Sequence, residues 1–334
     1  MHTHILLDHG SGGLASQRLI REVFVRHLDN TFLHSLNDAA CLQMGGRVAM
    51  STDTFTVTPL FFPGGDIGSL AVHGTVNDVA MIGAVPCFLS CGFILEEGLE
   101  LAVLERIVSS MAQAAKRAGV HIVTGDTKVV PAGAADQVFI NTTGLGEVLE
   151  AEPPQGDRAA PGDVVLVNGS IGDHGLAILA QREGLSFQTP VQSDSAALHH
   201  LVIRLLDQVG EVHVLRDPTR GGLATTINEI AEQSQVGIEL DEDSLVVNPG
   251  VAEGCALLGL DPLFLANEGK MICILPEERA QAALQVMQAD PLGAQARVIG
   301  RVVSRHPGRV VLNTRIGGQR LVYMLEGDQL PRIC

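Results

Sequence analysis

Aromatic residues and positive charge are both scarce in this chain of 334 residues. Aromatic residues make up 3% of it, with one Tyr and no Trp, while hydrophobic residues as a whole reach 46%. The core must therefore be aliphatic and rich in small residues, a composition typical of α/β proteins. The net charge of −16 argues against nucleic acid as a partner, because phosphate backbones are bound by Lys and Arg.

Segments that would direct the chain to a membrane are missing as well. No apolar stretch approaches the ~20 residues that span a bilayer. Residues 1–8 have neither the basic region nor the long apolar region of a signal peptide. We therefore expect a cytoplasmic protein with no membrane partner.

The cysteines show neither a disulfide framework nor the spacing of a zinc site. Cys87 and Cys91 lie in an apolar run that predicts a strand, and a separation of four residues puts both thiols on one face of it. We expect these two to be buried core thiols. The six cysteines are Cys41, Cys87, Cys91, Cys255, Cys273 and Cys334.

The common nucleotide fingerprints are also absent. No Gly-x4-Gly-Lys-Ser/Thr occurs, and Gly144-Leu-Gly146 lacks the third glycine of a dinucleotide-binding turn. A nucleotide site in this chain must therefore be built in another way.

Strand and helix patterns alternate along the chain and predict two α/β domains. Residues 150–162 hold three prolines, two glycines and four charges, and this composition is typical of a linker. We place the domains at 1–152 and 153–322, followed by a mobile tail at 323–334. The first domain is predicted to contain helices at 14–28, 64–82 and 101–118 and strands at 46–51, 86–95, 120–124 and 137–148. The second is predicted to contain strands at 163–168, 236–240, 270–275, 296–303, 309–313 and 320–324 and helices at 173–183, 195–209, 223–234, 250–258 and 277–289.

Acidic and amide residues recur where the pattern predicts strand ends and helix starts. Such positions meet at one edge of an α/β sheet, where ligands bind. Converging carboxylates would repel one another unless a cation neutralised them, and Mg²⁺ with a polyphosphate fits that need. The alternative is that each Asp caps a helix or completes a turn. The four motifs are Asn37-Asp38, Ser51-Thr-Asp53, Thr75-Val-Asn77-Asp78 and Gly125-Asp126-Thr-Lys128.

Three further residues carry groups suited to catalysis. Lys128 lies two residues beyond Asp126 and could reach a phosphate or a developing oxyanion. Arg220 lies in a donor-rich turn, Arg216 to Gly222, that enters a helix and could bind an anion. Glu268 follows an apolar run, so burial would raise its pKa toward that of a useful base. An ordinary Glu-Gly turn is the alternative for Glu268.

The chain ends in Pro331-Arg-Ile-Cys334. A thiolate is a nucleophile, and a thiol at a free end can visit both a donor enzyme and a pocket within its own chain. The alternative is a frayed end whose thiol has no role.

Seven motifs spread from the first loop to the last residue together resemble the HypE family, the carbamoyl dehydratases of [NiFe]-hydrogenase maturation. That family belongs with aminoimidazole ribonucleotide synthetase (PurM), selenophosphate synthetase and thiamine-monophosphate kinase. The resemblance implies a PurM-like α/β (α+β) fold, an N-terminal sheet that forms a homodimer, a C-terminal α/β sandwich, and ATP with Mg²⁺ near the dimer interface. The motifs are Asp8-His-Gly-Ser-Gly-Gly13, Leu60-Phe-Phe-Pro-Gly-Gly65, Cys91-Gly-Phe-Ile-Leu-Glu-Glu-Gly98, Thr124-Gly-Asp-Thr-Lys-Val-Val130, Asp217-x-Thr-Arg-Gly-Gly222, Asn267-Glu-Gly-Lys270 and Pro331-Arg-Ile-Cys334.

The resemblance also implies a reaction. Cys334 would receive a carbamoyl group from a HypF carbamoyltransferase, and ATP-dependent dehydration would turn this thiocarboxamide into a thiocyanate. A HypC–HypD complex would then accept the cyanide for the hydrogenase iron. Glu268 would take the N–H proton, and Lys128 would stabilise charge on the carbamoyl oxygen.

The resemblance assigns ligand residues in two sets. Family members often have two acidic residues where this chain has Asn37-Asp38, so only Asp38 carries over. The implied metal ligands are Asp38, Asp53, Asp78 and Asp126. The implied nucleotide-binding residues are Gly12, Gly13, Thr75, Asn77, Asn141 and Arg220.

Two other functions fit part of the sequence. Another enzyme of the superfamily, phosphorylating a small molecule, would need the acidic motifs but not Cys334. An acidic scaffold presenting a terminal thiol to a metal-bearing partner would need Cys334 but not Lys128. ATP hydrolysis that depends on carbamoylated Cys334 separates the three functions.

Overall fold

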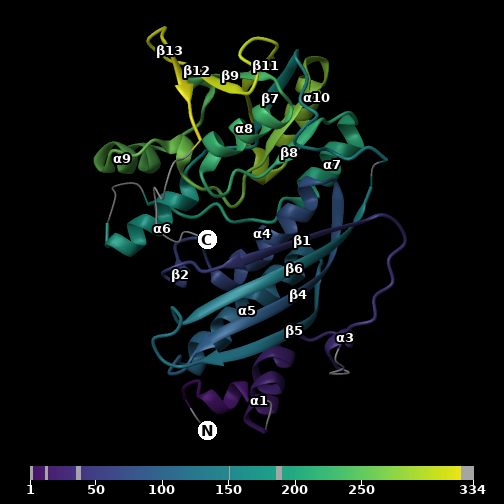
Figure 1. Ribbon diagram of the computed structural model, residues 1–334, viewed down its shortest axis with the longest axis vertical. Coiled ribbons are helices and arrows are strands. Elements are labelled where there is room, and N and C mark those ends of the chain that lie inside the picture. Colours follow the sequence, from purple (N-terminus) through teal and green to yellow (C-terminus); the bar gives the residue numbers. More distant parts are fainter. Residues whose placement is uncertain (1–2, 12–13, 35–38, 150, 186–189, 325–334) are drawn as a thin grey trace.

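The computed structural model describes residues 3–11, 14–34, 39–149, 151–185 and 190–324 (Figure 1). Four residues with predicted roles, Gly12, Gly13, Asp38 and Cys334, lie outside these ranges, as does most of the predicted tail. The described chain forms two α/β domains, each built around its own sheet. No helix in these ranges is long and apolar enough to cross a bilayer.

The first sheet has the order β1-β6-β4-β5, and only the β4–β5 pair is parallel. One face of this sheet is covered by two helices, α4 (Ile67–Met81) and α5 (Leu101–Ala118), and the other face is open (Figure 1). α5 ends at Gly119, whose φ of +68° suits glycine at a left-handed cap. The strands are β1 (Val48–Phe55), β4 (Ala84–Glu96), β5 (His121–Val130) and β6 (Val138–Val148).

Helix α4 is the central element of the first domain. Every residue of it except Asp78 is buried, because α4 packs against β1, β6, α5 and α7 at once. A helix that is buried all round shows no amphipathic stripe. A hairpin of β2 (Phe61–Phe62) and β3 (Gly65–Asp66) leads into it, and the Asp66 carboxylate caps the helix by accepting from the backbone N–H of Gly68 and Ser69.

The predicted helix at 14–28 is present but irregular. α1 (Leu14–Leu19) continues as a π-helical turn over Ile20–Val25 and ends in α2 (Arg26–Leu28). A 3₁₀ turn at Leu7–Gly10 precedes α1, and α3 (Thr31–His34) follows α2.

The second sheet has seven strands in the order β13-β12-β9-β11-β7-β10-β8. Alternate residues of β7 (Asp163–Val167), which lies inside this sheet, face opposite cores, as the period of two requires. Val165 and Val167 pack with α8 on one face, whereas Val164 and Leu166 pack with α7 and α10 on the other. The strands are β7 (Asp163–Val167), β8 (Val214–Arg216), β9 (Gly237–Asp241), β10 (Ile272–Pro276), β11 (Arg297–Val303), β12 (Arg309–Asn313) and β13 (Gln319–Val322).

The described part of the second domain contains five α-helices, and the sequence predicts all five to within a few residues. They are α6 (Asp173–Glu183), α7 (His199–Val209), α8 (Gly222–Gln233), α9 (Pro249–Leu258) and α10 (Ala280–Gln288). Short 3₁₀ turns lie at Glu242–Ser244, Pro262–Phe264, Glu277–Arg279 and Pro291–Gly293. Strand β8 is not predicted, because three residues are too few to show a period.

The two domains share an apolar contact. Ala80 and Met81, at the end of α4, lie in one core with Leu198, Leu201 and Leu205. Leu198 directly precedes α7, and the other two leucines lie within that helix. The end of the first domain's central helix is therefore fixed directly against the second domain.

The prediction for Cys87 is wrong, whereas Cys91 is buried as expected. The pairing of β4 with β6 shifts register between Pro86 and Phe88, and such a bulge exchanges the two faces of a strand. Cys87 is therefore partly exposed, and its thiol donates to the carbonyl of Val85 at 3.3 Å.

Candidate functional site

Of the four predicted acidic motifs, three lie among the described residues, and these lie within helices and strands rather than at strand ends and helix starts. Asp53 is in β1, and Asn77 and Asp78 are in the last turns of α4. Asp126 and Lys128 are in the middle of β5, which runs six residues past its predicted end at 124. The prediction that these residues gather at strand ends is therefore wrong, and the sheet register decides which of them meet.

The register separates Asp126 from Asp53. Asp53 pairs with Thr142, Thr142 with Cys91, and Cys91 with Gly125, so Asp126 lies three strands away from Asp53. Three spacings of a β-sheet amount to about 14 Å. Within one chain, Asp126 therefore cannot share a metal ion with Asp53.

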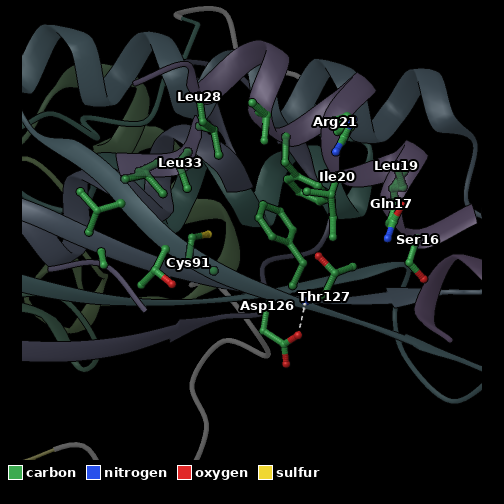
Figure 2. Close-up of a pocket in the computed structure, with 18 of the residues that line it drawn as sticks. Ser16, Gln17, Leu19, Ile20, Arg21, Leu28, Leu33, Cys91, Asp126 and Thr127 are labelled. Atoms are coloured by element: carbon green, nitrogen blue, oxygen red, sulfur yellow. Dashed lines mark hydrogen bonds between the residues drawn. The ribbon is translucent and has the colours of Figure 1, made fainter. Parts of the chain in front are cut away.

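The two carboxylates also face opposite sides of the sheet. The Asp53 side chain faces α4, since a Cβ on Gly74 of that helix would lie 3.6 Å from Asp53 Oδ2. Asp126 points to the open side, opposite to its neighbour Thr127 (Figure 2). Lys128 lies on the same open side, with Nζ 3.6 Å from Asp126 Oδ2, and both side chains are largely exposed.

Asp126 and Lys128 line a pocket of about 530 Å³ at the β5 edge of the sheet. The helical segment from Ser16 to Leu33 covers it, as Figure 2 shows. His9 and Gly10, next to the predicted glycine pair Gly12 and Gly13, line it as well. The described first part of the glycine-rich loop and the Asp126 motif are thus neighbours, as a common ligand would require.

A separate acidic cluster forms where the two domains meet. Asp53 from β1 and Asp78 from α4 lie near Asp217, in the turn before α8, and near Glu268, in the segment before β10. Ser51 Oγ donates to Asp78 Oδ2 at 2.6 Å and orients that carboxylate. Arg220, exposed on the turn, lowers the pKa of both Asp53 and Asp78 by its charge, although burial raises them more.

Asp217 is a member of this cluster that the sequence analysis did not assign. Burial raises its pKa to about 7, and the charges of Asp78 and Asp53 act in the same direction. The sequence did show Asp217 in the turn that was predicted to bind an anion through Arg220. Its meeting with Asp78, which lies in the other domain, is a tertiary contact that no local pattern predicts.

The cluster has an excess of negative charge that suits a cation. Carboxylate oxygens are the donors that Mg²⁺ prefers. Burial is the largest cause of the raised pKa values of Asp78 and Asp217, and repulsion between the carboxylates raises them further. Within the described ranges, however, no three acidic, His or Cys side chains stand close enough together to ligate one ion. Asp38, the remaining predicted ligand, lies outside those ranges.

Glu268 is the most deeply buried acid of the cluster, at 3% exposure. Burial raises its pKa well above the ordinary value, and Asp217 is the next largest cause. No hydrogen bond to its carboxylate is found among the residues that the structure describes, whereas its backbone N–H and C=O are both bonded. Asn267 fixes its distance from Asp217, because the Asn267 amide donates to the carbonyl of Pro218 at 3.0 Å. Glu268 therefore has the placement expected of a base.

Two predicted nucleotide ligands have other partners. The Thr75 hydroxyl is fully buried and lies 2.5 Å from the hydroxyl of Thr142, joining α4 to β6. The Asn77 amide donates to the carbonyls of Ala196 and Glu268 and accepts from Leu198 N–H. Neither side chain has a donor left for a nucleotide, so both assignments are corrected to structural contacts.

Asn141 lies on the open face of the sheet, where its amide donates to the Asp53 carbonyl and to Thr54 Oγ1, both at 2.9 Å. It therefore fixes the backbone that carries Asp53. Contact of Asn141 with a nucleotide remains a prediction, as it does for Arg220.

Two domain families match the chain. Residues 36–148 match the N-terminal domain of AIR synthase related proteins, and residues 160–313 match the C-terminal domain. A thiamine monophosphate kinase from Aquifex aeolicus shares the fold with a TM-score of 0.64 at 19% identity, over 92% of this chain and 99% of that one.

Relatives that match almost the full length of the chain identify its family within this superfamily. The chain is 56% identical to the carbamoyl dehydratase HypE of Azotobacter vinelandii, over 98% of this chain and 96% of that protein. It is 46% identical to the carbamoyl dehydratase HypE of Escherichia coli K12, over 99% of both chains. A crystal structure of the hydrogenase maturation protein HypE in complex with ATP superposes with a TM-score of 0.96 at 62% identity, over 98% of this chain and 99% of that one. The fold, the acidic cluster and these relatives together establish that the chain belongs to the HypE family of carbamoyl dehydratases.

Proposed function

We propose that this chain dehydrates a carbamoyl group carried on its own Cys334, converting S–C(=O)–NH₂ into S–C≡N at the expense of ATP. The observation that carries the proposal is Glu268: a buried carboxylate with a raised pKa and no partner among the described residues, held beside the acidic cluster. A small-molecule kinase of the same superfamily would have no use for Cys334. The full-length relatives named carbamoyl dehydratase support the same reaction.

The chemical obstacle is that an amide oxygen is a very poor leaving group. ATP supplies the phosphoryl group that turns this oxygen into part of a departing phosphate. One of the two amide protons passes to a phosphate oxygen when the amide oxygen is phosphorylated. Glu268 takes the other as the C≡N bond forms and the C–O bond breaks with phosphate as the leaving group. Water must be kept away from the reacting group, because a thiocarbamate would otherwise hydrolyse. The 3% exposure of Glu268 meets that requirement.

ATP binding is proposed here from two observations. The relative at 62% identity was solved with ATP, and Arg220 stands at the start of α8, where a helix N-terminus favours anions. We propose that Arg220 contacts the phosphates. Gly12 and Gly13, which follow the pocket-lining residues His9 and Gly10 in the sequence, are proposed to contact the nucleotide as well.

Mg²⁺ fits the acidic cluster by charge and by donor type. At most two of Asp53, Asp78 and Asp217 would contact the ion directly, and the predicted ligand Asp38 and phosphate oxygens of ATP would complete its coordination. When bound, it neutralises charge on the transferring phosphoryl group. Neutralising the cluster would also lower the pKa of Glu268 toward a range in which it acts as a base.

Mg²⁺ should stabilise the protein more at pH 8 than at pH 5. The pKa of Asp217 is raised from 3.8 to about 7 in the folded state. Between these values the folded state binds more protons than the unfolded state, so stability falls as the pH rises through this window. Above pH 7 the Asp217 carboxylate is ionised, and a cation offsets its repulsion by Asp78 and Asp53. Thermal melts with and without Mg²⁺ measure the difference.

Asp217→Asn should reduce the Mg²⁺-induced rise in melting temperature at pH 8. Asp207→Asn, which removes an exposed carboxylate from α7, is the matched control and should leave that rise unchanged. An equal rise at both pH values, or an unaltered rise in Asp217→Asn, would contradict a cation site at the cluster.

We propose further that the chain forms a homodimer through the open face of the first sheet. Large apolar side chains are exposed on that face, including Met50 at 70% and Ile94 at 41%. Lys128 lies on this face as well, and β5 is three strands from the β1 edge that carries Asp53. Lys128 would therefore complete the acidic site of the second copy, not that of its own chain.

Mixing two inactive variants tests this arrangement. Dimers that pair a Lys128→Ala chain with a Glu268→Gln chain contain one site in which both changes coincide and one site with neither. Mixing should therefore restore activity to about a quarter of the wild-type rate, because about half of the dimers are mixed and each has one intact site. No recovery in demonstrably mixed dimers, or a purely monomeric protein, would contradict the proposal.

The proposed partners follow from the reaction. A HypE–HypF complex has been solved whose matching chain is 47% identical to this one, with a TM-score of 0.81, over 92% of this chain and 99% of that one. We propose that a HypF carbamoyltransferase loads Cys334 and that a HypC–HypD complex accepts the cyanide, with all of these steps in the cytoplasm.

Intact-mass spectrometry tests the function as a whole. The protein is incubated with a HypF carbamoyltransferase, carbamoyl phosphate and ATP. The chain should gain one carbamoyl group and then lose one water, and the loss should require ATP. ATP hydrolysis without prior carbamoylation would favour a kinase, and carbamoylation without loss of water would favour a scaffold.

A further inference from the structure

We infer that Asp194 and Asn77 are positioning residues that fix Glu268 between the two domains. The inference rests on the proposed role of Glu268 as the base. It is carried by contacts on both sides of the Glu268 backbone and by the segment 193–198, to which the sequence analysis gave no role.

Asp194 binds three consecutive residues with one carboxylate. It accepts from the backbone N–H of Glu268 at 3.1 Å and of Gly269 at 3.2 Å, and from Lys270 Nζ at 2.9 Å. The Asp194 side chain is 6% exposed and that of Lys270 is 11% exposed. Burial alone would raise the pKa of Asp194, but Lys270 and the backbone donors outweigh it and lower the pKa below its usual value. The charged, fully bonded carboxylate is thus a fixed anchor for the Glu268 turn.

Asn77 holds the same turn from the first domain. Its amide nitrogen donates to the Glu268 carbonyl at 3.3 Å and to the Ala196 carbonyl at 3.0 Å, and its oxygen accepts from Leu198 N–H at 2.8 Å. All three contacts are with backbone groups of the second domain. Glu268 is therefore held at its N–H by Asp194 and at its C=O by Asn77.

The segment that carries Asp194 is itself anchored by two serine–histidine pairs. Ser193 Oγ lies 2.7 Å from His174 Nδ1, and Ser195 Oγ lies 2.9 Å from His73 Nδ1. Burial and the charge of Arg117 lower the pKa of His73 to about 4, so its ring is neutral at physiological pH. His73 and Asn77 are one turn apart on α4, and both contact this segment.

Two glycines allow the segment to fit between the domains. A Cβ on Gly64 would lie 2.6 Å from the Ser193 carbonyl oxygen, and a Cβ on Gly269 would lie 1.9 Å from that of Asp194. Both positions therefore require glycine. This close approach gives the motif Leu60–Gly65 a function that the sequence did not reveal: it supports the Asp194 segment from the first domain.

The arrangement couples the base to the acidic cluster through one rigid element. Asn77, which holds Glu268, and Asp78, which belongs to the cluster, are adjacent on α4. Any shift of α4 would move both residues together, so the distance between base and cluster is preserved. Precise placement of a base matters because a displacement of about 1 Å can cost on the order of 10² in rate.

A double-mutant cycle with Glu268 tests the inference. Asp194→Asn keeps the size of the side chain, but its amide N–H group must face either Glu268 N–H at the Oδ1 position, or both Gly269 N–H and the Lys270 ammonium at the Oδ2 position. We expect the rate of dehydration to fall on the order of 10- to 100-fold, while the KM for ATP stays within about twofold and Cys334 is carbamoylated normally. In a Glu268→Gln background, Asp194→Asn should have an effect of less than about twofold, because its effect acts through Glu268.

The controls separate positioning from general destabilisation. Asp290→Asn removes the carboxylate that pairs with Arg204 elsewhere in the second domain, and it should leave the rate unchanged. If Asp194→Asn does not fold, Asn77→Ala provides the same cycle from the first domain. If Asp194→Asn or Asn77→Ala lowers the rate of dehydration by the same factor in the wild-type and in the Glu268→Gln background, the inference is overturned. A wild-type rate in Glu268→Gln alone overturns the proposed base instead.

Discussion

Cys334→Ala should abolish formation of the thiocyanate completely, because the chain then has no thiol at the position that both the transferase and the acidic site must reach. The variant should fold and bind ATP as the wild type does. Incubation with a HypF carbamoyltransferase and carbamoyl phosphate should leave its intact mass unchanged, whereas the wild-type chain gains one carbamoyl group.

The other thiols explain why no substitute is expected. Burial raises the pKa of the Cys91 and Cys273 thiols far above the neutral range, and it raises that of Cys255 to about 11. Thiols in that state are poor nucleophiles. Of the described cysteines, Cys41 alone is fully exposed, while Cys87 is only partly so.

Cys41→Ala is therefore the matched control. It removes the most accessible competing thiol and should leave both carbamoylation and dehydration unchanged. A Cys334→Ala chain that still gains the carbamoyl group, whether at Cys41 or elsewhere, would refute the role of the terminal thiol.

Most helices and the longer strands could be predicted from the sequence because each has a local signal. Helix 101–118, for example, is predicted with both of its ends correct, because an amphipathic pattern is followed by Gly119. In the structure Gly119 forms a left-handed cap. Bulges have no such signal. The register shift beside Cys87 exchanges the faces of β4 and reverses the prediction for that thiol.

The candidate site could be predicted only in part, for a related reason. Asp53, Asp78 and Glu268 are each identified by type and do meet in one cluster. The sequence predicts that Asp126 joins the same cluster, because the strand before it is predicted to end at residue 124. The strand continues to Val130, and its alternation puts Asp126 on the open face.

Helix α4 shows where periodicity gives no answer. From the sequence, Thr75 and Asn77 are expected to contact the nucleotide. Because α4 is buried on all sides, however, its sequence has no polar stripe that would distinguish a residue facing a ligand from one facing the other domain. Their hydrogen bonds to Thr142 and to the 193–198 segment decide the question, and these are contacts over long sequence separations.

Glu268→Gln should separate carbamoylation from dehydration. Gln keeps the shape of the side chain, but it cannot accept the proton of the amide nitrogen. Loss of a positioned base costs about 10²- to 10⁴-fold in rate, or roughly 3–5 kcal/mol of barrier. The variant should accept the carbamoyl group on Cys334 and bind ATP, yet accumulate the carbamoylated chain. A time course of intact mass follows the step directly, since the two forms differ by one water.

The pH dependence gives a second measurement of the same group. Burial and the charge of Asp217 raise the pKa of Glu268 above its ordinary value. Only the ionised carboxylate acts as a base, so the wild-type rate of dehydration should fall as the pH drops through this raised pKa. In Glu268→Gln the rate should no longer depend on pH in this range. Glu253→Gln, at an exposed position on α9, is the control and should retain it. Wild-type rates in Glu268→Gln would exclude the residue from proton transfer, and loss of ATP binding would make it a binding residue instead.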